Sequence, residues 1–221
     1  MQLKCMIGDG IHALANYLIS FAERKSPAAF FITGTDTGVG KTHVACALIR
    51  ELRRRNIRAA GLKPICCGDR ADARELWKCS GREIPLDVIN PIHLPQPLAP
   101  VSQSGPSWPV LLRRARHAFG QFAAWNTRII LVEGAGGLLC PITKKNTMRE
   151  LARALGLPVV VVARNQLGVL NHALLTVAAA SAAGIECTAI VLNSPGGRMD
   201  HSSKTNAKAL AQLTRIPVFK F

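Results

Sequence analysis

The chain has 221 residues, of which 48% are hydrophobic and 19% charged, a balance typical of a globular protein and not of a disordered chain. Its length predicts one domain with one sizeable core. No apolar run approaches the roughly 20 residues that span a bilayer, which argues against a membrane protein.

The charge balance is strongly basic, with 28 Lys and Arg against 13 Asp and Glu and a formal net charge of +15. Such an excess fits nucleic acid, an acidic membrane surface or anionic small substrates. The basic residues are scattered, however. The densest group, from Arg53 to Arg58, ends a predicted helix, where cations interact favourably with the helix dipole. Because no basic face is interleaved with aromatic residues, we expect neither a nucleic-acid nor a membrane partner.

The seven cysteines, at positions 5, 46, 66, 67, 79, 140 and 187, include no C-x-x-C pair. An odd number without such spacing indicates neither a zinc site nor a disulfide framework. Several lie inside apolar patterns, as reduced buried thiols do, and the N-terminus lacks the features of a secretion signal. We therefore expect a cytoplasmic protein.

Residues 1–27 precede the first predicted strand. Apolar residues at helical spacing, from Ile11 to Ala22, predict an amphipathic helix over about 10–24. We expect this segment to be an N-terminal helical extension and residues 28–221 to form the main domain. Packing of the helix on the core, a partner-binding role and a misassigned start codon remain alternatives for it.

The stretch from Ala28 to Thr42, AAFFITGTDTGVGKT, has the order of a phosphate-binding loop. Apolar residues predict a short buried strand, glycines at 34, 38 and 40 form a turn, and Lys41-Thr42 opens a helical pattern. Backbone N–H groups of such a turn converge on phosphate oxygens, the lysine adds a positive charge, and the threonine hydroxyl can bind magnesium. The strict pattern fails by one position, because Thr35 stands where the first glycine belongs. A glycine-rich turn without a ligand is the alternative.

The rest of the chain alternates strands with helices. This alternation predicts an α/β fold with a mostly parallel sheet and helices on both faces, in a single domain. Residues 64–106, in a region with seven prolines between positions 85 and 109, form a long excursion of the kind that covers or builds a site. Strands are predicted at 29–32, 58–63, 129–132, 158–163, 188–192 and 216–219, and helices at 41–55, 72–80, 107–124, 147–155, 170–183 and 200–214.

Polar side chains mark the ends of several predicted strands, where ligands of open α/β sheets bind. Besides the phosphate loop, these are Lys63, Glu133 and Asn193. Glu133 directly follows a buried strand, where the magnesium of a nucleotide is usually held, and Asn193 is well placed to bond a base. Singly, they could be a solvated lysine, a helix-dipole partner and a turn residue. Beside a nucleotide loop, the functional interpretation is favoured.

Six segments together resemble the dethiobiotin synthetase family, in its order and approximate spacing. They are 34–42, 61–65, 72–73, 132–137, 167–176 and Asn193, and the resemblance covers residues 29–218. It implies a fold similar to the P-loop NTPases and an ATP- and Mg²⁺-dependent reaction of biotin synthesis. CO₂ would add to an amine of 7,8-diaminononanoate, ATP would phosphorylate the carbamate, and the second amine would close the ring to give dethiobiotin, ADP and phosphate.

The resemblance also implies roles for individual residues. Lys41 and Lys63 would be the catalytic cations, and Thr42, Asp72 and Glu133 would hold Mg²⁺. The substrate would contact Thr37, Cys67 and, in a homodimer, the N-terminus of a helix of the other subunit at Gly168, Val169 and Asn171, a favourable place for a carboxylate. The nucleotide would contact Gly38, Val39, Gly40, Lys41, Thr42, His43, Asp72, Glu133, Gly134, Ala135, Gly136, Asn193, Ser194, Pro217 and Val218.

The sequence departs from the family pattern at two positions of the expected site. Cys67 stands where the family commonly has a small hydroxyl residue, and Gln166 replaces a basic residue often found before the 167–176 motif. We expect Lys63 and Lys41 to lower the pKa of Cys67 and so raise its thiolate fraction. Alternatively, Cys66 and Cys67 both point into the core.

Two other classes of function remain as alternatives. The first is a related P-loop switch or amidotransferase-type ATPase. Proteins of that class carry a signature lysine early in the loop, where this chain has Asp36. The second is a nucleotide-binding pseudoenzyme or a basic nucleic-acid module, which would rest on the net charge alone.

Overall fold

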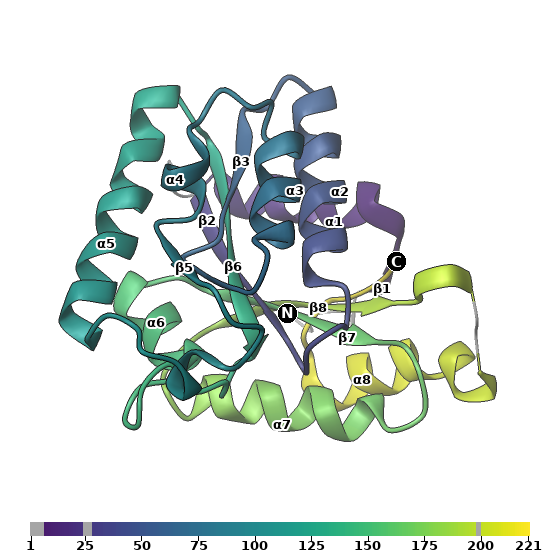
Figure 1. Cartoon of the computed structure of the whole chain (residues 1–221). Helices are drawn as coiled ribbons and strands as arrows, with labels where there is room; N and C mark the ends of the chain where they lie inside the picture. Colours follow the sequence, from purple (N-terminus) through teal and green to yellow (C-terminus); the bar gives the residue numbers. More distant parts are fainter. Residues whose placement is uncertain (1–6, 24–27, 198–199) are drawn as a thin grey trace.

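The computed structural model describes residues 7–23, 28–197 and 200–221. Within these residues seven strands form one sheet whose pairings are all parallel, and helices cover both of its faces (Figure 1). The single-domain α/β fold predicted from the alternation of strands and helices is therefore confirmed.

The seven-stranded sheet places the phosphate loop near its middle. Its strands, in chain order, are β1 (Ile7–Asp9), β2 (Ala28–Gly34), β3 (Ala59–Leu62), β6 (Ile129–Gly137), β7 (Val159–Arg164), β8 (Cys187–Asn193) and β9 (Val218–Lys220). Their order in space is β1-β9-β8-β7-β2-β6-β3, so β2 lies between β7 and β6. Strands buried on both faces have continuous apolar sequences. The run of four valines in β7, all 0% exposed, is an example.

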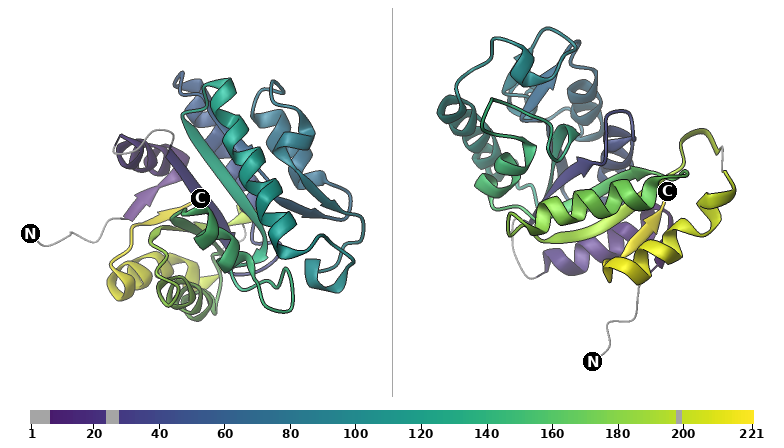
Figure 2. Two further views of the ribbon diagram at one scale, coloured as in Figure 1. Left: turned by 90° about the vertical axis from the view of Figure 1, so that its left-hand side faces the viewer. Right: turned by 90° about the horizontal axis from the view of Figure 1, so that it is seen from below.

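The helices form two layers, with α1, α2 and α3 on one face of the sheet and α5 to α8 on the other (Figure 2). In the described part of the chain, no helix is both long and apolar enough to cross a membrane. The helices are α1 (Gly10–Ala22), α2 (Lys41–Arg54), α3 (Ala71–Cys79), α4 (Leu86–Ile89), α5 (Trp108–Gln121), α6 (Met148–Leu155), α7 (Val169–Ser181) and α8 (Asn206–Thr214), with 3₁₀ turns at Pro100–Ser102, Phe122–Trp125, Pro195–Gly197 and His201–Lys204.

The excursion over residues 64–106 contains a second, two-stranded parallel sheet that the sequence analysis missed. Strand β4 (Ile65–Cys67) pairs with β5 (Ile92–Leu94). Backbone bonds anchor both ends of β4, from Lys63 N to Ile89 O at 2.7 Å and from Gly68 N to Leu94 O at 2.9 Å. Strands of three residues are too short for alternation to reveal them.

The N-terminal segment adds a strand and a helix to the main sheet. β1 pairs with β9 at the edge, with Ile7 level with Val218, and α1 buries Leu14 and Leu18 in the core. The helix expected over about 10–24 is observed, whereas β1 was not predicted. Residues 1–6 and 24–27 lie outside the described part of the chain.

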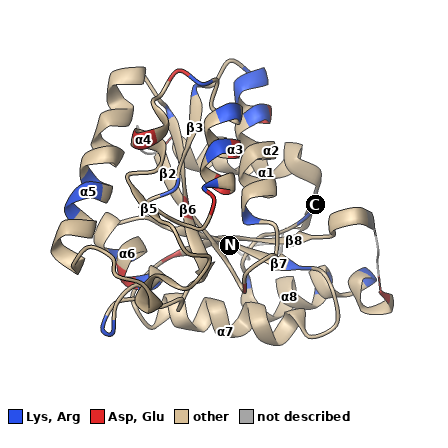
Figure 3. Cartoon of the chain, in the orientation of Figure 1, with Lys and Arg blue, Asp and Glu red and all other residues tan. Residues whose placement is uncertain are grey.

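The basic residues are spread over α2, α3, α5 and several loops (Figure 3), and some of them serve the fold. Glu51 on α2 is 6% exposed and accepts bonds from Arg54 at 3.0 Å and from His12 of α1 at 2.8 Å. The hydrogen bonds from Arg54, His12 and Arg55, with Arg54 first, outweigh the effect of burial and lower the pKa of Glu51 to about 2. Arg55 also donates to the His12 carbonyl at 3.5 Å, so part of the basic excess joins α1 to α2.

Helix α6 begins with the capping box predicted from the sequence. The Thr147 hydroxyl accepts a hydrogen bond from Arg149 N at 3.2 Å, and Glu150 Oε2 accepts one from Thr147 N at 2.7 Å. These bonds satisfy backbone N–H groups that a helix start otherwise leaves free.

Thr147→Ala should lower the free energy of unfolding by about 1 kcal/mol, because the N-cap acceptor is lost. Urea titration followed by circular dichroism measures it. Ser107→Ala is a matched control, since Ser107 caps α5 with no side-chain bond. Equal losses in the two variants would contradict a capping contribution.

Candidate active site

The phosphate loop requires glycine at two positions between β2 and α2. A Cβ atom on Gly34 would lie 2.7 Å from the Asp36 carbonyl oxygen, and one on Gly40 would lie 2.0 Å from Asn193 Nδ2. Gly40 also has φ of 95°, which favours glycine. Near the start of the loop, therefore, the position that has no room for a side chain is Gly34. This explains why Thr35 is tolerated where the strict pattern has glycine.

Two side chains hold the loop from opposite sides. Lys41 Nζ donates to the Asp36 carbonyl at 3.0 Å, and Asn193 Nδ2, from the end of β8, donates to the Val39 carbonyl at 2.9 Å. Asn193 is 1% exposed, so this amide is part of the interior. Burial, followed by the repulsion of Lys63, lowers the pKa of Lys41.

Lys63 lies directly after β3 and is buried against two carboxylates. Its Nζ donates to Glu133 Oε1 at 2.6 Å, to Asp72 Oδ2 at 2.8 Å and to the Gly134 carbonyl at 3.2 Å. Burial alone would lower the pKa of Lys63, but the charges of Glu133 and Asp72 outweigh it and the pKa is raised. Burial likewise works against the charge of Asp72, yet Lys63 holds the pKa of that carboxyl below its usual value.

Glu133 connects this cluster to the first turn of α2. Its Oε1 also accepts the Thr42 hydroxyl at 2.8 Å, while Oε2 is buried without a hydrogen-bond partner. Because an unpartnered buried carboxylate oxygen is costly, Oε2 is an open position for a cation. The structure thus brings Lys63, Asp72, Glu133 and Thr42 together, as expected from the strand ends.

A cavity of about 580 Å³ lies between the phosphate loop and this cluster, within the usual range for small-molecule sites. Lys41, Lys63 and Asp72 line its charged side. Residues 95–103, hereafter the strap, supply Pro97, Leu98, Ala99 and Pro100 as an apolar wall. The remaining lining residues are Thr37, Gly38, Gly40, Thr42, Cys67, Ala135, Gly136 and Cys140.

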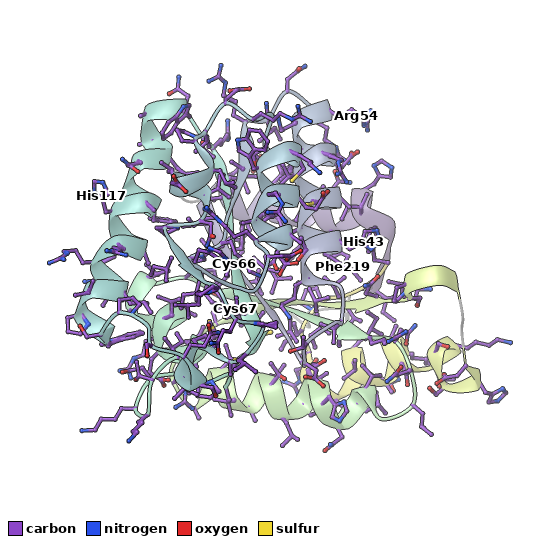
Figure 4. The ribbon with its side chains drawn as sticks, viewed as in Figure 1. His43, Arg54, Cys66, Cys67, His117 and Phe219 are labelled. Atoms are coloured by element: carbon purple, nitrogen blue, oxygen red, sulfur yellow. The ribbon has the colours of Figure 1, made fainter. Side chains whose placement is uncertain are left out.

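Cys67 lines the cavity, whereas its neighbour Cys66 is 3% exposed and belongs to the interior (both labelled in Figure 4). The alternative that both thiols point into the core is therefore wrong. The expectation of a lowered pKa is wrong as well, because burial, followed by Cys66 and Cys140, raises the pKa of Cys67. The charge of Lys63 is largely compensated by its two carboxylate partners.

The other side of the loop faces the ends of β8 and β9. Ser194 N donates to the Phe221 carbonyl at 2.7 Å, and the Phe221 ring lies 5.1 Å from that of His43, between ring centroids. Val218 is 0% exposed and level with Ile190, so Pro217 and Val218 lie below the carboxyl edge of the sheet. Phe221, at the end of the same segment, lies at this edge.

The turn that opens α7 lies outside the cavity. Gly168 has φ of 91°, Val169 is buried and Asn171 is exposed, and none of the three lines the cavity of its own chain. Leu167, just before them, is 81% exposed.

The sequence analysis missed the strap residues and Cys140 as parts of the site. It predicted that the proline-rich excursion covers or builds a site. A loop without periodicity, however, does not reveal which of its side chains face the cavity. Cys140 follows the glycine-rich end of β6. The expected proximity of that segment to the phosphate loop could have indicated that Cys140 belongs to the site.

Comparison with known proteins first shows the class of fold to which the chain belongs. A model of the AAA domain family matches residues 28–219. The structure of the signal recognition particle receptor FtsY from Elizabethkingia anophelis is 17% identical, with a TM-score of 0.55 over 94% of this chain and 63% of the receptor chain. The kinase domain of the Escherichia coli tyrosine kinase ETK is 18% identical, with a TM-score of 0.57 over 87% of this chain and 78% of that domain. At these identities the likeness shows the fold alone, which is like that of the P-loop NTPases.

Curated relatives narrow the class to a family. An ATP-dependent dethiobiotin synthetase from Anaeromyxobacter dehalogenans strain 2CP-C is 46% identical over 83% of this chain and 84% of its own length. Those of Akkermansia muciniphila and Xanthomonas euvesicatoria are 37% and 36% identical over 86% of this chain, and the match covers 89% and 88% of their lengths. The chain belongs to the dethiobiotin synthetase family.

Lys63→Met should lower the free energy of unfolding by about 3–5 kcal/mol, because Glu133 would remain buried without its cation. Adding Glu133→Gln should recover most of that loss. Urea unfolding of both single variants and the double variant gives the coupling. Lys78→Met is the control, since its pair with Glu75 is about half exposed and should contribute less than about 1 kcal/mol. Strictly additive effects of the two site substitutions would contradict the buried pair.

Proposed function

We propose that this protein catalyses the ATP-dependent carboxylation and ring closure of 7,8-diaminononanoate with CO₂, giving dethiobiotin, ADP and phosphate. The observation that carries the proposal is the position of Lys63, buried between Glu133 and Asp72 and facing the same cavity as the phosphate loop. The curated relatives, which are ATP-dependent dethiobiotin synthetases, support the same activity.

The reaction joins anionic partners, and the site supplies cations for them. A carbamate formed from CO₂ and one amine has to attack the terminal phosphate of ATP, and phosphoryl transfer is catalysed mainly by positioning and charge stabilisation. We assign that stabilisation to Lys41 and Lys63. The backbone of residues 38–43 would hold the phosphates, with Ala135 and Gly136 at the opposite wall. Thr37 and Cys67, which line the cavity, would meet the amines of the substrate.

The residues of the cluster also fit Mg²⁺. Magnesium is usually held by one or two carboxylates together with waters and substrate phosphates. Thr42, Asp72 and the unpartnered Oε2 of Glu133 provide such a donor set. Consistent with so few protein ligands, no group of three or more His, Cys, Asp or Glu in the described residues could hold a metal on its own. When bound with ATP, the ion would neutralise phosphate charge.

The base of the nucleotide would lie at the ends of β8 and β9. The reacting end of ATP has to reach Lys63, so the base falls on the opposite side of the loop. There we expect contacts from Asn193, Ser194 and the segment that starts at Pro217 and Val218 and ends at Phe221.

We further propose that the protein acts as a homodimer with α7 at the shared site. Surface helices normally alternate polar and apolar faces, but α7 has no charged residue and leaves Leu175 61% exposed. Its N-terminus, at Gly168 to Asn171, is suited to a carboxylate yet lies outside the cavity of its own chain. The partner subunit's cavity would bring a substrate carboxylate to it.

The alternatives are not favoured. The likeness to the receptor FtsY and the tyrosine kinase ETK extends to the fold alone. A nucleic-acid module would rest on a net charge that is dispersed over the molecule (Figure 3). We propose a cytoplasmic location, since six of the seven cysteines lie in the described residues and all six are free thiols.

Release of phosphate from ATP should require the diamine, bicarbonate and magnesium together, because phosphoryl transfer needs the carbamate as acceptor. Purified protein is assayed for phosphate and dethiobiotin with each component left out in turn. Equal ATP hydrolysis without the diamine would refute the synthetase and favour a switch ATPase.

Mixing Lys63→Ala with Asn171→Ala subunits should restore activity. Random exchange makes half of the dimers mixed, and one of the two sites in each is intact, so about a quarter of the wild-type rate is expected. Light scattering at assay concentration establishes the mass. A monomer, or no rescue after subunit exchange, would contradict the shared site.

A further inference from the structure

The strap forms the apolar half of the cavity with little help from regular structure. Its prolines, at 95, 97 and 100, have no backbone N–H to donate. Within the described residues, one backbone hydrogen bond joins it to the rest of the cavity wall, from Val101 N to the Pro141 carbonyl at 3.3 Å. A segment with so few backbone hydrogen bonds needs other contacts to hold its conformation.

The side-chain amide of Gln103 provides these contacts as hydrogen bonds. Its Oε1 accepts a hydrogen bond from Gln96 N at 3.0 Å, and its Nε2 donates to the Gln96 and Leu98 carbonyls, both at 2.8 Å. One side chain therefore closes the strap on itself, across the part of the strap that faces the cavity.

Leu98 is the side chain of the strap that has most to gain from a ligand. It lines the cavity and remains 50% exposed, so it has apolar surface that a ligand in the cavity can cover. Pro97 and Ala99 extend the same wall. On the opposite side the cavity presents Lys41, Lys63 and Asp72.

We propose that Gln103 is a positioning residue that sets chain-length specificity by holding Leu98 against the hydrocarbon chain of the substrate. The inference rests on the proposed function, since it assigns the apolar wall to the methylenes between the amines and the carboxylate. Burying one methylene contributes about fourfold in affinity. A wall held by three hydrogen bonds can select for those methylenes, whereas a loose one cannot.

The test uses Gln103→Glu in the full-length protein. Glutamate keeps the shape and the acceptor but cannot donate to the two carbonyls, so the strap should loosen. We expect KM for the diamine to rise about tenfold, with kcat and the Kd for ATP unchanged. We also expect the roughly fourfold penalty for a substrate shortened by one methylene to fall toward none. Gln212→Glu, an exposed glutamine on α8, is the matched control and should change neither quantity.

Leu98→Asn tests the same wall without touching the amide, and it should reduce the methylene selectivity in the same way. Unchanged selectivity in Gln103→Glu and Leu98→Asn would overturn the inference, as would a parallel loss of ATP binding, which would indicate general damage to the site. Failure of the wild type to make dethiobiotin refutes the proposed function instead, so the two failures are distinguishable. If Gln103→Glu does not fold, Leu98→Asn alone decides.

Discussion

A lysine and a glutamate buried side by side, Lys63 and Glu133, impose the strongest constraint on this structure. Lys63 directly follows β3, Glu133 lies in the neighbouring strand β6, and each is at most 2% exposed. Removing two charges from water costs several kcal/mol per ion, and pairing offsets it only when further hydrogen bonds complete the set. Thr42 and Asp72 provide those bonds, which draws the first turns of α2 and α3 to the same place. Such a pair contributes little net stability, so its position at the ligand edge is best understood through the charge it presents to a substrate.

The phosphate loop is held so that its two sides differ. On one side Lys41 and the Lys63 cluster border the cavity. On the other, Asn193 packs so closely under Gly40 that no Cβ fits there, and His43 meets Phe221. We therefore expect a nucleotide on the loop to lie with its phosphates toward the cations and its base toward β8 and β9. The packing that would set this direction exists within the protein itself.

The parts of this arrangement that depend on local patterns could be predicted from the sequence. The interior strands are continuous apolar runs, and Lys63, Glu133 and Asn193 directly follow such runs. What depends on partners distant in sequence could not. β1, β4 and β5 are three residues long and exist because another strand lies beside them. The pKa of Cys67 was misjudged because a sequence shows that a lysine is near but not how far the thiol is buried, and burial is the main cause of the raised pKa. The contact of Pro217 and Val218 with the nucleotide stays a prediction, whereas Phe221, at the same edge of the sheet, was not foreseen because its place depends on the pairing of β9 with β8.

The bonding of Lys63 also determines how a substrate can reach it. An ammonium group has three N–H donors, and all three are used, by Glu133, Asp72 and the Gly134 carbonyl. An incoming anion must displace one of them. Glu133 has no access to water, whereas the Asp72 side chain is 49% exposed and can be solvated when released. Of the two carboxylates, Asp72 is therefore the less costly to exchange, and its release leaves that carboxylate beside Thr42 and Glu133, free to meet a cation. Because Asp72 is shared in this way, we expect an anion at Lys63 and a cation at the carboxylates to favour each other's binding.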